Sequence, residues 1–137
     1  MLLRIHIMAA SFWIGLIVVE TIIELLAVKG SEKDLRFVTR AHKVVDTYFE
    51  GPVVAIVLVT GSMLLYELWP NISFLLAVKV LAGLVAVVVN IICIYFVLAR
   101  ASAEDEATFQ QWEKRVLKIG PWIPVAYVTF AIGLYGV

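Results

Sequence analysis

Four long apolar runs constrain this chain more than any other feature of its sequence. They cover about residues 5–28, 47–67, 74–99 and 119–137. A helix that crosses a bilayer needs about 20 apolar residues, so each run is long enough to span a membrane. The chain has 137 residues and is 63% hydrophobic, whereas water-soluble domains are roughly half apolar. The sequence therefore predicts an all-α integral membrane protein that forms one four-helix bundle, without a second domain.

Start and stop signals refine the expected helices. We expect one transmembrane domain over residues 1–137, with spans at about 3–28, 32–67, 74–99 and 119–137 and an amphipathic cytoplasmic helix at about 103–118. Ser31 precedes Asp34 by three residues, as in a capping box, and Ser102 precedes Asp105 in the same way. A helix over 32–67 would be about 54 Å long at 1.5 Å per residue. Its first third is therefore expected to extend beyond the bilayer.

The two capping serines are each followed by a Gly-Pro pair, at 51–52 and 120–121. This spacing indicates a weak internal repeat of two parallel helical hairpins, related by an axis along the membrane normal. The repeat brings His6 and Lys79 to nearly equivalent positions of the first and third spans. The alternative is a coincidence between two common helix-start motifs.

Positive charge is distributed unevenly although the formal net charge is zero. Nine basic residues lie in segments 29–43 and 100–118, whereas the opposite side of the predicted bundle has only Arg4. By the positive-inside rule, both segments are cytoplasmic and both termini lie outside. We expect a multi-pass protein of a bacterial inner membrane, with the lipid bilayer as its partner, a homodimer left open, and no nucleic-acid partner.

Several ionisable residues lie inside or beside these apolar runs. An ionised group near the bilayer centre costs about 3 kcal/mol, so such residues are rare and are usually functional. The inner group comprises Glu20, Glu24, His42, Asp46 and Glu50. Its members recur at helical spacing, which places them on facing sides of the first hairpin.

Three interpretations of this inner group stay open. Carboxylates and an imidazole suit a hard or borderline divalent cation. The same residues could handle protons or a substrate, with some carboxyls kept neutral by burial. They could also form structural ion pairs with Arg36, Arg40 and Lys43.

An outer pair, His6 and Lys79, lies nearer the opposite membrane surface. Trp13 shares the stripe of His6, and Gly83 shares that of Lys79. A neutral imidazole at the membrane edge is a common axial ligand of haem iron. Alternatively, His6 lies among the lipid headgroups and the Lys79 side chain extends outward to them.

The sequence also resembles a known group of membrane proteins. The similar stretches are 6–15 (HIMAASFWIG), 51–52 with 58–61 (GP and LVTG), and 76–81 (LAVKVL). They look like the HemJ-type protoporphyrinogen oxidases and the CopD copper-resistance domain, over about the first 95 residues. The resemblance implies that His6 and Lys79 match a histidine and a lysine associated with haem or porphyrin chemistry. The acidic inner group is not part of that pattern.

The preferred hypothesis is a protein that binds haem b, or a related tetrapyrrole, through His6 beside Lys79, with Trp13 and Gly83 near the cofactor. A HemJ-like oxidoreductase activity would follow. The alternatives are a metal- or proton-coupled binding or transport protein that uses the inner group, and a non-catalytic membrane module. The single cysteine, Cys93, excludes an intrachain disulfide and a multi-cysteine metal site.

Overall fold

The protein is all-helical over residues 1–119, the part that the computed structural model describes. Five α-helices and one π-turn follow each other along the chain. They are α1 (Leu2–Val28), α2 (Glu32–Val45), η1 (Asp46–Glu50), α3 (Gly51–Leu68), α4 (Phe74–Ala101) and α5 (Glu106–Ile119). The prediction of an all-α fold is confirmed for these residues. The fourth expected span, at 119–137, lies almost entirely outside them.

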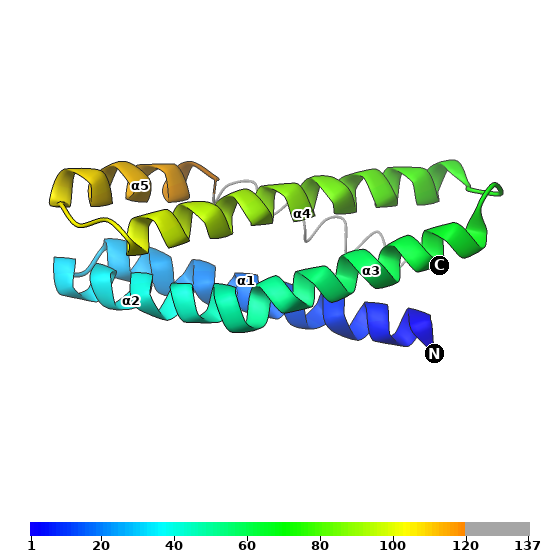
Figure 1. Ribbon diagram of the computed structural model, residues 1–137, viewed down its shortest axis with the longest axis horizontal. Helices are drawn as coiled ribbons and strands as arrows, with labels where there is room; N and C mark the ends of the chain where they lie inside the picture. Colours follow the sequence, from blue (N-terminus) through cyan, green and yellow to red (C-terminus); the bar gives the residue numbers. More distant parts are fainter. Residues whose placement is uncertain (120–137) are drawn as a thin grey trace.

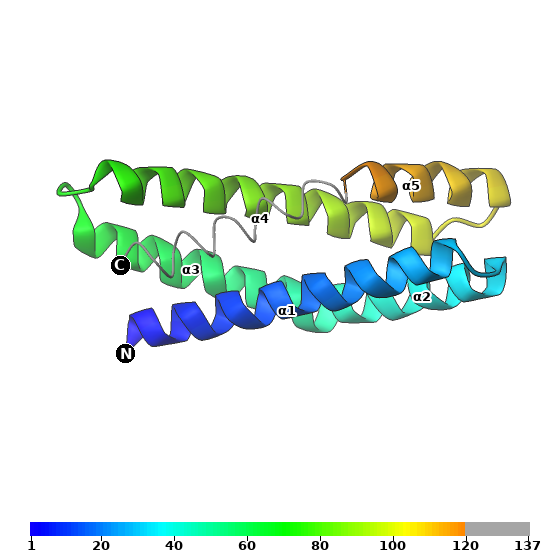
Figure 2. The same ribbon diagram turned by 180° about the vertical axis from the view of Figure 1, so that it is seen from behind.

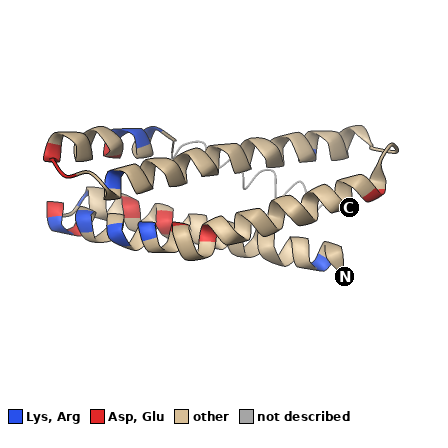
Figure 3. Ribbon diagram, viewed as in Figure 1, with Lys and Arg blue, Asp and Glu red and all other residues tan. Residues whose placement is uncertain are grey.

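Within residues 1–119, three helical segments are long and apolar enough to cross a membrane. They are α1, the continuous rod α2–η1–α3, and α4. Figures 1 and 2 show α1 running antiparallel to the α2–η1–α3 rod, with α4 beside them and α5 packed along the end of α4. Charged residues gather at the end of the molecule where α1 turns into α2 and α4 turns toward α5 (Figure 3). The remaining length of the helices is mostly uncharged.

The predicted capping box at the start of α2 is confirmed. The Ser31 hydroxyl accepts a bond from the Asp34 backbone N–H, and an Asp34 carboxylate oxygen accepts one from the Ser31 N–H at 2.8 Å. These two bonds satisfy donors that the first turn of a helix leaves free. The chain therefore reverses direction between α1 and α2 within three residues, 29–31.

The expected helix start at Ser102 is wrong. Ser102 ends α4, and its hydroxyl donates to the Leu98 carbonyl at 3.0 Å. Asp105 takes the capping position instead, because its carboxylate accepts the Thr108 N–H at 2.8 Å. These bonds from Thr108 hold the pKa of Asp105 below its usual range. Helix α5 consequently begins at Glu106.

Two apolar clusters form the core. One joins α1, α3 and α4 through Trp13, Ile17, Val54, Val57, Ala86 and Val87. The other lies at the charged end and joins α1, α2 and α5 through Ala27, Leu35 and Phe109. In addition, α1, α2, η1 and α4 contribute polar side chains to the interior. This polar layer consists of Glu20, Glu24, His42, Asp46, Glu50, Asn90 and Arg100.

Candidate metal centre

The π-turn η1 brings two carboxylates to the interior. Gly51 donates its backbone N–H to the Asp46 carbonyl, five residues back. Pro52 has no N–H, and its ring would collide with the carbonyl four residues back in a regular α-helix, so a wider turn precedes it. Asp46 and Glu50 are 4% and 2% exposed, whereas residues 47–49 between them are exposed. Both carboxylates of this turn therefore point inward.

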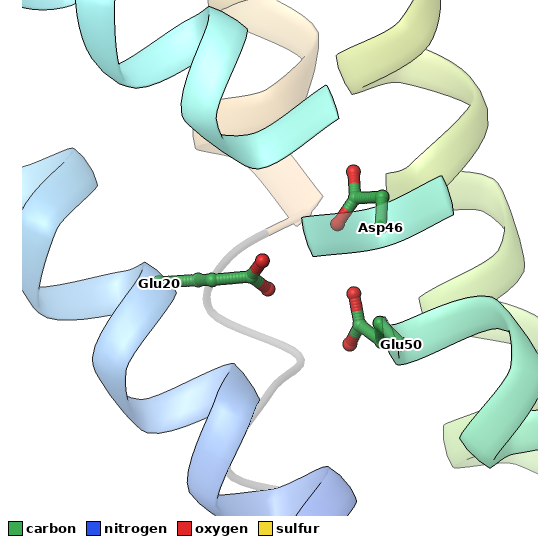
Figure 4. A group of neighbouring side chains, drawn as sticks. All are labelled: Glu20, Asp46 and Glu50. Carbon is green, nitrogen blue, oxygen red and sulfur yellow. The ribbon is translucent and has the colours of Figure 1, made fainter. Parts of the chain in front are cut away.

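Glu20 of α1 faces this pair across the bundle. Figure 4 shows the three carboxyl groups turned toward one another. One oxygen from each of Glu20, Asp46 and Glu50 lies within 4.8 Å of the others, a spacing at which one metal ion could bind all three. We call these three residues the carboxylate cluster. Glu20 Oε1 and Asp46 Oδ2 are buried and have no hydrogen-bond partner among the described residues.

Glu24, one turn further along α1, has a different role from Glu20. Arg100 binds it with two nitrogens, at 2.5 Å to Oε1 and 3.0 Å to Oε2. His42 Nδ1 lies 3.2 Å from the same Oε2. Arg100 is 0% exposed, so the ion pair is fully buried. The charge of Glu24 is therefore balanced by a cation of the protein.

Within residues 1–119, no lysine or arginine forms an ion pair with a member of the carboxylate cluster. The third interpretation, structural pairing with Arg36, Arg40 and Lys43, does not hold for Arg36, which binds Glu32 and Glu106 at the charged end. Arg40 and Lys43 are exposed. The negative charge of the cluster is thus left for protons or a bound cation to balance.

A cavity of about 320 Å³ adjoins the cluster. Its polar lining comprises Glu20, Thr21, Glu24, His42, Asp46, Glu50 and Asn90. The other walls are mostly apolar and include Ile17, Ala86, Val89, Ile94 and Val97. Cys93 also lines it. The cluster therefore borders a space that a cation with part of its hydration shell could enter.

The outer pair lies apart from this centre. His6 Nδ1 is 2.9 Å from the Thr60 hydroxyl, across the contact between α1 and α3. Gly61 packs against the imidazole, because a Cβ there would lie 3.1 Å from His6 Cε1. Lys79 is near enough for its charge to act on His6. Gly83 is half-buried on α4.

Trp13 belongs to the inner centre rather than to the outer pair. Its indole Nε1–H donates to Asn90 Oδ1 at 3.1 Å, and Asn90 Nδ2 donates to Glu50 Oε1 at 2.8 Å. Trp13 is 5% exposed and Asn90 9% exposed. The stripe of His6 and Trp13 on α1 therefore serves two separate sites.

Sequence reasoning missed the role of Arg100 and gave Asn90 none. Arg100 counted as one cytoplasmic charge among nine, but it stands three residues after Val97 and ten after Asn90, on the buried face of α4. That helical spacing was the available signal. A comparison with protein-family models, curated proteins and solved structures finds no match for the chain, so its function is argued from this site.

Proposed function

We propose that this protein is an integral protein of a bacterial inner membrane that binds a divalent cation through Glu20, Asp46 and Glu50. The membrane assignment is supported by the three long apolar segments and by their outer surfaces. Val19, Leu26, Val59 and Leu81 are each 58–65% exposed. Such continuous exposure of large aliphatic side chains suits lipid rather than water. The charged end would face the cytoplasm.

One observation carries the cation proposal. Three carboxylates offer oxygens within 4.8 Å of one another in the interior, and within residues 1–119 no lysine or arginine forms an ion pair with them, since the buried Arg100 is bound to Glu24. Taking an ion out of water costs several kcal/mol unless an opposite charge compensates it. A dication supplies that charge in the space between the oxygens. Oxygen ligands of this kind favour hard ions such as Mg²⁺, Mn²⁺ or Ca²⁺.

Glu24, another member of the predicted inner group, is held by Arg100 and by His42 Nδ1, and it supports the site without binding the ion. His42 Nε2 is buried, has no hydrogen-bond partner among the described residues and belongs to a side chain that lines the same cavity, so His42 is a candidate fourth ligand. Ionisable groups inside membrane proteins commonly mark ion or proton pathways. We therefore expect the cation site to be coupled to movement of a cation or protons through the bundle.

The test is metal binding by the full-length protein, purified in detergent. Elemental analysis identifies what co-purifies, and titration with Mn²⁺, followed by electron paramagnetic resonance, measures affinity. Wild type is expected to bind one Mn²⁺ per chain. Glu20→Gln, Asp46→Asn and Glu50→Gln should each weaken binding at least tenfold. Glu67→Gln is the control, because Glu67 is exposed at the opposite end of α3.

If neither wild type nor the variants bind a metal, the proposal is wrong and protons balance the cluster instead. Proton uptake by wild type and by Glu50→Gln, measured with a pH-sensitive dye, would then distinguish proton handling from a purely structural cluster. Loss of uptake in the variant would support proton handling.

A second candidate, haem b bound through His6, is favoured by one observation. The Thr60 hydroxyl can donate its one hydrogen to the Ile56 carbonyl, 2.6 Å away, and accept from His6 Nδ1–H at 2.9 Å. His6 Nε2 then carries the free lone pair that an iron ligand needs, and histidine ligands are commonly oriented by such a bond. Bound haem would supply the redox chemistry of a HemJ-like oxidoreductase. A Soret band in wild type that is lost in His6→Ala would support this candidate; no band after added haem would exclude it.

A further inference from the structure

Trp13, Asn90 and Glu50 form a hydrogen-bonded chain across three helical segments. The indole of Trp13 on α1 donates to Asn90 on α4, and the Asn90 amide donates to Glu50 in η1. All three residues are at least nine-tenths buried. This series of hydrogen bonds therefore links the carboxylate cluster to the apolar cluster that contains Trp13.

The chemistry of the chain fixes its direction. An indole N–H can only donate, and an amide has one accepting oxygen and one donating nitrogen. If the Asn90 amide flipped, its NH₂ group would face the Trp13 N–H, and its oxygen would face a Glu50 oxygen. Both contacts would then be unfavourable. Trp13 thus sets the orientation in which Asn90 presents a donor to Glu50 Oε1.

We propose that Asn90, oriented by Trp13, is a positioning residue that holds Glu50 in its cation-binding conformation. The Asn90 bond engages one Glu50 oxygen and leaves the other for the cluster. The bond also favours the side-chain rotamer of Glu50 in which its carboxylate accepts from Asn90. In this role Trp13 and Asn90 act through Glu50 and are not themselves ligands of the cation. This inference rests on the proposed function, since it concerns how the same site binds its cation.

The size of the expected effect follows from comparable metal sites. Removing a hydrogen-bond partner that orients a metal ligand typically costs roughly 10–100-fold in affinity. Asn90→Leu keeps a similar side-chain size and deletes the donor to Glu50. Trp13→Phe keeps an aromatic ring in the apolar cluster and deletes only the donor to Asn90.

The experiment measures Mn²⁺ affinity in wild type, Trp13→Phe, Asn90→Leu and the double variant. Asn90→Leu is expected to bind at least tenfold more weakly, and Trp13→Phe to lose less. The double variant should bind like Asn90→Leu alone, because Trp13 acts through Asn90. Trp112→Phe is the matched control, since Trp112 packs on Tyr95 and Phe96 and is not part of the Trp13–Asn90–Glu50 hydrogen-bond series.

Unchanged affinity in Asn90→Leu, or losses in the two single variants that multiply in the double variant, would overturn the proposal. Purely structural roles would give such independent losses. If Asn90→Leu does not fold, Trp13→Phe and Trp112→Phe decide the question: only the first should weaken Mn²⁺ binding. Absence of Mn²⁺ binding in wild type would instead overturn the proposed function, and this inference with it.

Discussion

Arg100 and Glu24 form a buried, bidentate ion pair that joins the last turn of α4 to α1, although 76 positions separate them in the sequence. The pair removes one carboxylate from the interior charge balance. It thereby distinguishes Glu24 from Glu20, which lies only one helical turn away. Two glutamates four residues apart on the same helix thus have different partners.

Removing one member of this pair should destabilise the protein strongly. Arg100→Met leaves Glu24 buried without its cation, which typically costs about 3–5 kcal/mol. The double variant Arg100→Met/Glu24→Leu removes both charges and should recover much of that loss. Denaturant unfolding in mixed micelles measures both effects. Arg40→Met is the control, because Arg40 is exposed at the same end; an equal loss in that variant would contradict the prediction.

A glycine comparison tests the π-turn. A Cβ at Gly51 would lie 3.0 Å from the Asp46 carbonyl oxygen, whereas a Cβ at Gly15 would meet nothing within 4 Å. Gly51→Ala should therefore disturb η1 and weaken Mn²⁺ binding. Gly15→Ala should leave binding unchanged and stabilise α1 by up to about 1 kcal/mol through helix propensity. Equal affinities in the two variants would show that η1 tolerates the methyl group.

The His6 tautomer can be measured directly. Nitrogen NMR of ¹⁵N-histidine-labelled protein should show His6 protonated at Nδ1 and not at Nε2, because the Thr60 hydroxyl donates elsewhere. Thr60→Val removes the acceptor and should populate the other tautomer. Thr21→Val is the control, since the Thr21 hydroxyl donates to the Ile17 carbonyl of its own helix and bonds to no histidine of the described residues. An Nε2-protonated ring in wild type would disprove this arrangement.

Phe109 should anchor α5. It is 3% exposed and packs with Ala27 and Leu35, and Arg36 stacks over its ring. Phe109→Ala should cost about 3–5 kcal/mol, as is usual for a buried phenylalanine. Phe37, which is 66% exposed on α2, provides the matched control. Thermal unfolding of the two alanine variants gives the comparison, and similar midpoints would mean that α5 contributes little stability.

The helices of the described part could be predicted because their signals are local. Apolar run length and the capping box at Ser31 depend on neighbouring residues alone. The Asp105 cap was overlooked in favour of Ser102, although both residues suit that role. The sequence shows the Gly51-Pro52 pair as a repeated motif. The wider turn before it forms only because helix α2 runs directly into this pair, and that continuity is not visible in the motif itself.

The candidate site was predictable only within single helices. Helical spacing correctly grouped Asp46 with Glu50 on one face. Which residue of α1 meets them depends on how far two apolar helices slide past each other, and apolar faces fix that offset weakly. Arg100 was assigned to the cytoplasm because a charge count treats all terminal cations alike. Its burial depends on contacts with a helix distant in sequence.

The polar layer of the interior gives the bundle a unique alignment. If α1 shifted along its axis by one turn, about 5.4 Å, the apolar side chains of the two clusters could still pack against apolar side chains. Glu24, however, would lose Arg100, and the Asn90 amide would lose Trp13. The hydrogen bonds and ion pairs of the polar layer therefore favour one alignment of the helices over shifted ones. Replacing all its members by aliphatic residues should yield helices that still associate, but in several interchangeable alignments.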